Sequence, residues 1–383
     1  MHIAFLIQDI TTAGGTERTT CCLAAELARQ GHRVTIVSVF RSEPEPHYHA
    51  EGVALHYLTQ QSYTLHDSAT RRLGKVLRRV SDVRRCEALR NADVIICQRL
   101  LACTLGVLAG FGGKAVACEH FKYAMYNAPV RWLRGRLYRR MRALVTLTDK
   151  DRDLFLAEGL RNVYCIPNMV SVTPLPYRGT DSRSIVSVGR LTPQKGYDLL
   201  LTAVASIADR MGDWHIDIYG EGEQRAALED QCRSLRLTHL VRFCGYRADI
   251  EQVYADSAFY VMSSRFEGFP MVLLEAAACG LPIVSFRCPE GPDVLLADGG
   301  GVLVPPEDTD ALAEALLRLI NDADLREQLR RRTPDIVRPY QPERIGAQWD
   351  ELLHQLTLAW DAGGSPASAP SGADPDIQSA PNP

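Results

Sequence analysis

The feature that most constrains the fold of this sequence is an alternation of short apolar runs with helical stretches. It begins with the run His2–Ile7 and continues with a helical stretch at Thr19–Arg29, which Gly31 is expected to terminate. An apolar run at Val34–Phe40 follows. Such short, continuous apolar runs are typical of parallel strands that are buried on both faces. They predict a β-α-β unit, which further runs extend: Val94–Cys97, Ala115–Cys118, Ala143–Leu147 and Val163–Ile166.

A second alternation of the same kind occupies the other half of the chain. It starts at Ser184–Gly189, after a segment, 171–183, whose prolines, glycine and polar residues are typical of an interdomain linker. We therefore predict two α/β domains, at 1–170 and 184–341, each with a mostly parallel sheet. A final amphipathic helix is expected at Pro342–Gln355 and a disordered tail at 362–383. The later strand-like runs are Ile216–Tyr219, Val241–Phe243, Phe259–Met262, Ile283–Phe286 and Gly301–Val304.

The composition is that of an ordinary globular protein. Of 383 residues, 46% are hydrophobic and 23% charged, which excludes a mainly disordered or collagen-like chain. The uncharged stretch Leu100–Gly113 is shorter than the roughly 20 apolar residues of a spanning helix, and residues 1–20 do not resemble a signal peptide. The eleven cysteines form no C-x-x-C pair, so we expect them reduced and the protein cytoplasmic.

Charge is unevenly divided between the two halves. Residues 1–170 hold 24 Lys and Arg against 15 Asp and Glu, whereas the remainder is acidic. Residues 131–142 carry six arginines and no acid, interleaved with Trp132, Leu133, Leu137 and Tyr138. Basic amphipathic stretches of this kind, including 71–90, are typical of peripheral contact with the inner face of a membrane. A solvated helix face is the alternative. Nucleic-acid binding is not indicated, because no recognition motif accompanies the charge.

Candidate binding residues follow the predicted strands, where ligands bind in open parallel sheets. Gly14-Gly15 after the first strand would let the backbone approach an anion, although a plain tight turn is the alternative. After Ser184–Gly189 come Arg190 and, five residues later, Lys195, which could neutralise a pyrophosphate or be two solvated surface charges.

The strongest candidate is the segment from Glu267 to Glu275. Pro270 suits a first helical turn and Gly280 a helix end, which predicts a helix at about Pro270–Cys279. Its free N–H groups, around Met271 and Val272, could bind a pyrophosphate. Glu275 lies inside an otherwise apolar helix and therefore needs hydrogen-bond partners. Sugar hydroxyls would serve, and so would a nearby arginine or a backbone N–H.

These residues also carry a family resemblance. The two glutamates form an E-x7-E pattern, and with Ser263–Ala276, Cys279–Pro282 and Cys288–Pro292 the chain resembles the retaining family-4 glycosyltransferases of exopolysaccharide, O-antigen and lipid-linked oligosaccharide synthesis. The resemblance extends to about residue 357. It implies the GT-B fold, in which two Rossmann-like domains face each other across a cleft and a C-terminal helix, here 342–357, crosses back to the first domain.

The resemblance implies a role for each matched residue. Arg190 and Lys195 match the pair that binds the donor pyrophosphate. Glu275 matches the glutamate that binds the ribose hydroxyls. Glu267 matches the glutamate that contacts hydroxyls of the transferred sugar. Glu119-His120 matches a Glu-His pair, which implies that His120 lies near the reacting sugar. Gly15 matches the glycine loop at the donor phosphate, and Tyr246 ends the segment Arg242–Tyr246 near the base. The remaining expected nucleotide-sugar contacts are Gly268, Phe269, Met271 and Val272.

The resemblance further implies retention of anomeric configuration and transfer from a nucleotide sugar, expected to be UDP-linked. The acceptor would be a glycan, expected to be linked to a polyprenyl diphosphate. Arg190, Lys195 and the helix N-terminus could stabilise the leaving group, so we expect no metal and no cofactor. The acidic cluster Asp149–Asp153 is interpreted as a helix start rather than a metal site.

Three departures from the family pattern and two alternative functions remain. Phe121 stands where members of the subgroup often have Asn, Met169 where Pro is usual, and Asp293 where Glu is common. The same scaffold also suits a phosphorylase or epimerase, although the complete E-x7-E segment argues against these. A non-catalytic protein that binds nucleotide sugars or anionic lipids is the other alternative.

Overall fold

The computed structural model describes residues 1–62, 69–120, 123, 127–288, 291–297 and 299–361. Within them the chain divides into two compact units. The first contains Met1–Thr12, Leu27–Ile166 and the chain from Gln348; the second contains Ala13–Glu26 and Pro167–Ala347. The tail expected at 362–383, and Phe121, lie outside the described residues.

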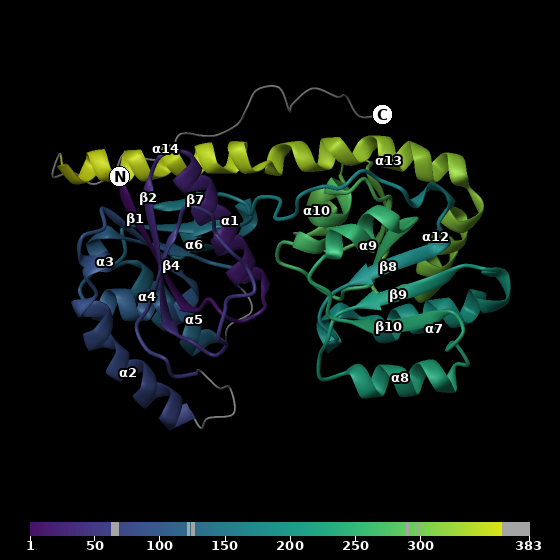
Figure 1. Cartoon of the computed structure of the whole chain (residues 1–383), viewed down its shortest axis with the longest axis horizontal. Helices are drawn as coiled ribbons and strands as arrows, with labels where there is room; N and C mark the ends of the chain where they lie inside the picture. Colours follow the sequence, from purple (N-terminus) through teal and green to yellow (C-terminus); the bar gives the residue numbers. More distant parts are fainter. Residues whose placement is uncertain (63–68, 121–122, 124–126, 289–290, 298, 362–383) are drawn as a thin grey trace. The chain divides into compact units, whose positions relative to one another are not determined.

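The first unit is built on a seven-stranded sheet in the order β3-β2-β1-β4-β5-β6-β7, in which every pairing is parallel (Figure 1). Its strands are β1 (His2–Asp9), β2 (Arg33–Phe40), β3 (Ala54–Tyr57), β4 (Val94–Gln98), β5 (Ala115–Cys118), β6 (Ala143–Thr146) and β7 (Val163–Cys165). Helices follow these strands along the chain: α2 (Ala69–Arg85), α3 (Glu87–Arg90), α4 (Arg99–Leu108), α5 (Ala128–Tyr138) and α6 (Asp149–Ala157). Helix α1 (Gly15–Arg29) follows β1 in the chain, but its residues up to Glu26 belong to the second unit.

The second unit has a six-stranded parallel sheet in the order β10-β9-β8-β11-β12-β13. Its strands are β8 (Ser184–Val188), β9 (His215–Tyr219), β10 (Val241–Gly245), β11 (Phe259–Met262), β12 (Ile283–Phe286) and β13 (Gly301–Val304). Its helices are α7 (Tyr197–Ile207), α8 (Arg225–Ser234), α9 (Ile250–Asp256), α10 (Met271–Ala278), α11 (Pro292–Leu295), α12 (Thr309–Asn321) and α13 (Ala323–Val337). The last helix, α14 (Pro342–Asp361), begins in this unit and ends in the first.

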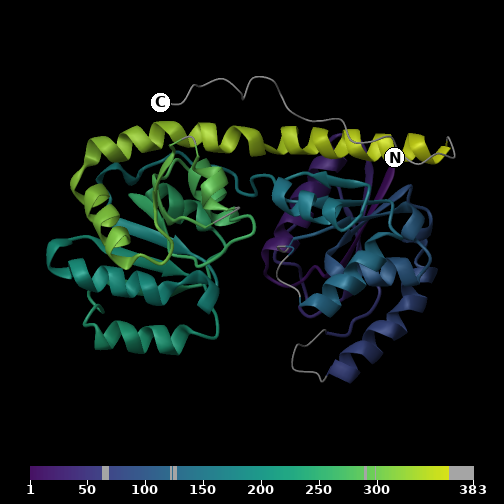
Figure 2. The same cartoon turned by 180° about the vertical axis from the view of Figure 1, so that it is seen from behind.

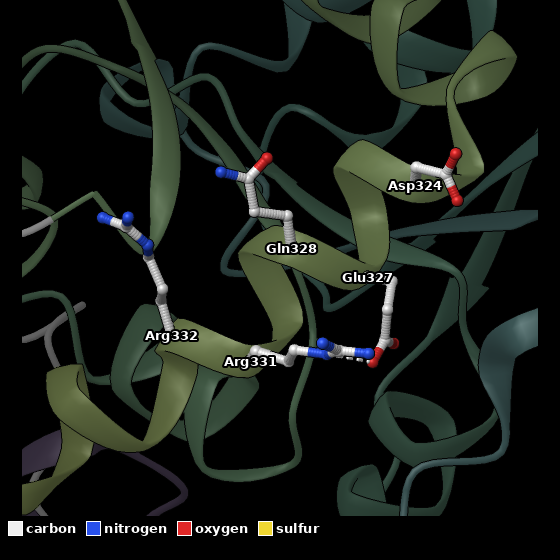
Figure 3. A pocket seen from close by; sticks show the side chains of 5 residues that line it. All are labelled: Asp324, Glu327, Gln328, Arg331 and Arg332. Atoms are coloured by element: carbon white, nitrogen blue, oxygen red, sulfur yellow. Dashed lines mark hydrogen bonds and ion pairs between the residues drawn. The ribbon is translucent and has the colours of Figure 1, made fainter.

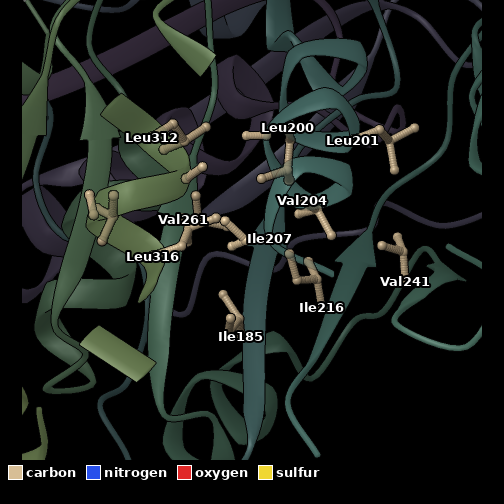
Figure 4. Close-up of a cluster of buried hydrophobic side chains, with 14 of the residues drawn as sticks. Ile185, Leu200, Leu201, Val204, Ile207, Ile216, Val241, Val261, Leu312 and Leu316 are labelled. Carbon is tan, nitrogen blue, oxygen red and sulfur yellow. The ribbon is translucent and has the colours of Figure 1, made fainter. Parts of the chain in front are cut away.

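Helices cover both faces of each sheet, as Figures 1 and 2 show from opposite sides. In the second unit, successive side chains of β8 enter two different cores. Ile185 packs with α7 and α12 (Figure 4), whereas Val186 packs with α9 and α10. This explains the continuous apolar runs, because a strand buried on both faces has no side for polar residues.

The predicted parallel sheets are confirmed, with three local differences. The edge strand β3 was not predicted, because three of its four residues are exposed and it lacks an apolar run. Helix α1 begins at Gly15 rather than Thr19, since the Arg18 N–H already donates to the Gly14 carbonyl at 3.1 Å. The final helix extends beyond Gln355 to Asp361.

All eleven cysteines are free, and eight of them are buried. Burial raises the pKa of Cys21 and Cys165 to about 12, which keeps both thiols protonated at neutral pH. No helix among the described residues combines the length and apolar character needed to cross a bilayer.

Candidate functional site

In each sheet the strand order reverses at one point, and the expected binding residues gather near these points. The reversal lies between β1 and β4 in the first sheet and between β8 and β11 in the second. Such switch points open a crevice at the carboxyl ends of the strands. Arg190 and Lys195 follow β8, and Glu267 follows β11. His120 follows β5, which is next to β4.

The loop after β8 has a tightly defined backbone. Arg190 is exposed, and no ion-pair partner for it occurs among the described residues. Gly189 leaves room for the neighbouring lysine, because a Cβ there would lie 3.3 Å from the Lys195 methylenes. Gly196 then adopts a φ of 62° at the start of α7, a conformation that favours glycine.

The loops after β8 and β11 are bonded to each other. The Lys195 ammonium lies 2.7 Å from Glu267 Oε1, and the Ser264 hydroxyl donates to the same oxygen at 2.6 Å. Further hydrogen bonds join the loops: the Ser263 hydroxyl donates to the Lys195 carbonyl, the Arg265 N–H to the Gln194 carbonyl, Gln194 Nε2 to the Phe266 carbonyl and Arg265 Nη1 to the Pro193 carbonyl. Two residues expected to contact the donor thus neutralise each other in the free protein.

The start of α10 differs from the prediction. Pro270 has a non-helical ψ of 85°, so the helix begins at Met271. The Met271 N–H, expected to be free, donates to the Phe269 carbonyl at 3.0 Å. The Val272 N–H has no partner among the described residues, as is usual for a first-turn N–H of a helix.

Glu275 is buried in α10 and has protein partners. Its Oε1 accepts from the Ser171 hydroxyl at 2.7 Å and lies 3.2 Å from Arg18 Nη1. Burial raises the pKa of Glu275, while Arg18 and Ser171 lower it. The sequence left open whether sugar hydroxyls or an arginine would pair with this carboxylate, and in the free protein it is an arginine and a serine.

Three other expected contacts lie around these loops. Tyr246 is 53% exposed and follows Gly245 on β10, with β9 between it and β8. Gly268 lies in the turn before α10. The Phe269 ring packs edge-on against Tyr340 at 5.4 Å between centroids, so it contributes to the core as well as to the site's rim.

Gly15, the first residue of α1, faces open space. A Cβ added there would meet no atom within 4 Å, and its φ is not in the left-handed region. Neither steric room nor backbone conformation in the described structure therefore requires glycine at this position.

His120 is a neutral histidine held by Gln98. Its Nε2 contacts the Gln98 side-chain oxygen, which can only accept, so Nε2 carries the proton and Nδ1 keeps a lone pair. Burial, and then the nearby Arg99, lower the pKa of His120 to about 3. It can therefore accept a hydrogen bond but is not a general acid at neutral pH.

The neighbouring Glu119 lies in the core of the first unit. It accepts from the Tyr138 hydroxyl at 2.7 Å and pairs with the fully buried Arg134 at 3.4 Å. Arg134 was counted with the basic membrane-facing stretch 131–142, and the structure corrects this, because it faces inward from α5. Trp132 and Leu133 of the same helix are 62% and 59% exposed.

The acidic cluster at 149–153 starts a helix, as predicted. The Thr148 hydroxyl caps α6 by accepting from the Asp151 N–H. Within the part of the chain that the structure describes, no group of three or more His, Cys, Asp or Glu could hold a metal. A hollow on α13 (Figure 3) contains none of the expected site residues; it is lined by Asp324, Glu327, Gln328, Arg331 and Arg332.

The sequence analysis assigned no role to four residues that bond to expected site residues: Arg18, Ser171 and Ser264 in the second unit, and Gln98 in the first. Arg18 had one available signal, since it lies one helical turn after Gly15 and so shares its face of α1. Ser264 lies within the segment Ser263–Ala276 that carries the family resemblance, but it was given no contact of its own. Gln98 and Ser171 contact their partners only through the fold and carry no motif.

Two family models match the chain. The model described as Glycosyltransferase Family 4 matches residues 13–173, and the one described as Glycosyl transferases group 1 matches residues 182–322. Among curated relatives, the amylovoran biosynthesis glycosyltransferase AmsD of Erwinia amylovora is 27% identical, over 92% of this chain and 99% of its own.

Solved structures share the fold at lower identity. Sucrose-phosphate synthase from Thermosynechococcus elongatus has a TM-score of 0.76 at 20% identity, over 93% of this chain and 99% of its own. Anabaena HepE, solved in complex with UDP and glucose, has a TM-score of 0.73 at 20% identity, over 92% of this chain and 99% of its own. Both carry the two-unit architecture described above.

Proposed function

This chain belongs to glycosyltransferase family 4, and we propose that it is a retaining enzyme that transfers a hexose or N-acetylhexosamine from a UDP-sugar to a glycan in surface polysaccharide assembly. The observation that carries the proposal is the bonded pair of loops after β8 and β11. It brings Lys195, Glu267 and the start of α10 together at one switch point, with Arg190 beside them. The AmsD relative, named for amylovoran biosynthesis, and HepE, solved with UDP and glucose, support the acceptor and donor classes.

The proposed chemistry follows from where charge develops. Breaking the bond between the anomeric carbon and the pyrophosphate oxygen leaves an oxocarbenium-like sugar and a growing negative charge on the phosphate. Arg190, Lys195 and the Val272 N–H supply positive charge to that leaving group, so the proposed reaction needs no metal and no cofactor. Glu267 and Glu275 accept hydrogen bonds from the transferred sugar and the ribose.

Donor binding would exchange partners at Lys195. In the free protein its ammonium pairs with Glu267. A bound pyrophosphate would draw the ammonium away and free Glu267 to accept from a sugar hydroxyl. One binding event would thus prepare both the leaving-group contact and the sugar contact.

The acceptor side of the proposal rests on the first unit. Trp132 and Leu133 expose apolar surface on α5, and Arg136 stacks on Trp132 at 4.4 Å. Aromatic and cationic side chains together suit a membrane interface. We propose that this face contacts the inner leaflet from the cytoplasm, where an acceptor linked to a polyprenyl diphosphate would lie.

Calorimetry with a panel of UDP- and GDP-sugars, with EDTA and then with magnesium, tests the donor. We expect micromolar binding of one UDP-sugar in EDTA and slow release of UDP without acceptor. With acceptor, NMR should show that the transferred sugar has the same anomeric configuration in the product as in the donor. Binding without any UDP release, even with glycan acceptors, would favour the non-catalytic binder. An inverted product would exclude retention.

Arg190→Ala tests the leaving-group contact. We expect kcat to fall by about 10²–10³, the typical effect of losing one contact to developing charge. Arg178→Ala is the matched control, because Arg178 pairs with Asp256 and belongs to no expected contact. Near-normal turnover of Arg190→Ala would remove Arg190 from the site.

A further inference from the structure

We propose that Arg18 is a positioning residue for donor binding, which keeps the Glu275 carboxylate charged and fixed so that it can accept hydrogen bonds from the donor ribose. The inference rests on the proposed function, because it assumes that Glu275 meets the ribose. It adds a residue on α1 that the sequence analysis did not assign, and it predicts how donor binding depends on pH.

Arg18 is shared by two carboxylates. Its Nη1 lies 3.2 Å from Glu275 Oε1, and its Nη2 lies 3.1 Å from Glu251 Oε1. Nη2 also donates to the Ser171 carbonyl at 3.1 Å. The Arg18 side chain is only 18% exposed and that of Glu275 only 5%. A planar guanidinium anchored at three points holds its partner carboxylate in one orientation.

The Glu275 carboxylate needs this cation to stay ionised. Burial is the largest influence on its pKa and raises it, and the charge of Glu251 raises it further. Arg18 opposes them most strongly, followed by the Ser171 and Tyr254 hydroxyls. The groups that face Glu275 are Arg18 and Cys22 on α1, Glu251 and Tyr254 on α9, Tyr260 on β11, Cys279 after α10, and Ser171. Arg18 is the only cation in this set, so its removal leaves two carboxylates facing each other.

Protonation would change what Glu275 can bind. An ionised carboxylate offers two acceptor oxygens to the two hydroxyls of a ribose, whereas a protonated carboxyl carries a donor of its own. Donor binding would then require the proton to leave. An Arg18 variant should therefore bind UDP more weakly as the pH falls, and should release a proton on binding.

The test is calorimetry of the full chain with UDP, between pH 5.5 and 8.5, in buffers of different ionisation enthalpy. The terminal phosphate of UDP has a second pKa of about 6, so the wild type sets the baseline for pH dependence and proton release. Arg18→Met should lose about tenfold more affinity than the wild type between pH 8 and pH 6, with more proton release on binding than the wild type shows. Adding Glu251→Gln should reduce that difference, because it removes the like charge. Arg178→Met, which breaks an ion pair elsewhere in the same unit, should behave as wild type.

An affinity loss in Arg18→Met that is equal at all pH values, with no more proton release than in the wild type, would overturn the proposal and leave Arg18 a structural role. If Arg18→Met does not fold by circular dichroism, Arg18→Lys serves instead. Its single ammonium should give a smaller pH dependence of the same sign, and no pH dependence would again overturn the proposal. Failure of the wild type to bind UDP would contradict the proposed function, which separates the two results.

Discussion

At the scale of single residues, His120 shows how the surroundings of a side chain determine its protonation state. With a pKa lowered to about 3, it stays neutral across the range in which an ordinary histidine titrates. We therefore expect no His120 titration between pH 5 and 8 in NMR spectra, with His120→Gln used to assign its signals. A midpoint near the ordinary 6.5 would contradict the partly buried, Gln98-bonded state.

The same residue makes a prediction for stability. Between about pH 6.5 and 3 the unfolded chain binds a proton at this histidine and the folded chain does not, so the free energy of unfolding falls as the pH drops through that window. His120→Gln should show a shallower decline in urea titrations at pH 7, 6 and 5. Equal slopes for the two proteins would show that His120 is not buried as described.

A substitution at Gly15 can test ligand contact without disturbing the fold. Gly15→Ala adds a methyl group into open space at a helix start, so the free energy of unfolding should change by less than about 0.5 kcal/mol. If donor phosphates approach this backbone, the affinity for UDP-sugar should fall at least about tenfold. Unchanged affinity, measured beside unchanged stability, would exclude the approach.

Residue types were predictable from the sequence, but their pairings were not. Lys195 and Glu267 were both expected at the donor, yet nothing in their spacing indicates that they bond to each other when the donor is absent. Arg18 and Glu251 lie 233 residues apart in the chain, and only the fold brings them together. Whether the expected residues act as proposed awaits the experiments above.

At the scale of elements, two glycines in the left-handed region give a matched comparison. Gly280, after α10, has a φ of 79°, and a Cβ there would make ordinary contacts. Gly196, before α7, has a φ of 62°, and a Cβ there would collide with the Ser263 carbonyl. Gly280→Ala should cost about 1–2 kcal/mol from the backbone alone.

Gly196→Ala should cost more than Gly280→Ala and should also weaken UDP binding. The collision would push the loop after β8 away from the loop after β11 and separate Lys195 from Glu267. Urea unfolding and calorimetry of both variants check this. Equal destabilisation with intact UDP binding in Gly196→Ala would mean that the two loops need not stay bonded.

Element prediction succeeded best for the short apolar runs. The strands β5, β11 and β12 are buried along their whole length and β13 only at Val304, and all four were predicted with the bounds that the structure gives. The edge strand β3 was missed, since its exposed residues leave no pattern to detect. Arg134 was misplaced because charge alone indicates surface, and its partners Glu119 and Tyr138 become visible only in the fold.

At the scale of the whole molecule, the GT-B prediction is confirmed by the two parallel sheets and by the solved structures that share them.

The membrane contact is a prediction for the full chain. We expect it to bind vesicles containing about 30% anionic lipid, and more weakly as salt increases. Trp132→Ser with Leu133→Ser should lower binding at least about threefold, measured by sedimentation. Leu235→Ser, which alters another exposed leucine on the second unit, is the control. Equal binding by both variants would exclude α5 as the contact.

The bond between Lys195 and Glu267 has a consequence for how the affinity of this protein would respond to ionic strength. An anion that enters the site replaces an internal carboxylate rather than loosely held counterions from solution. Salt weakens the old ion pair and the new one together, so the two effects largely cancel. The affinity of this protein for a phosphate ligand should therefore fall less with rising salt than the affinity of a site with two unpaired cations.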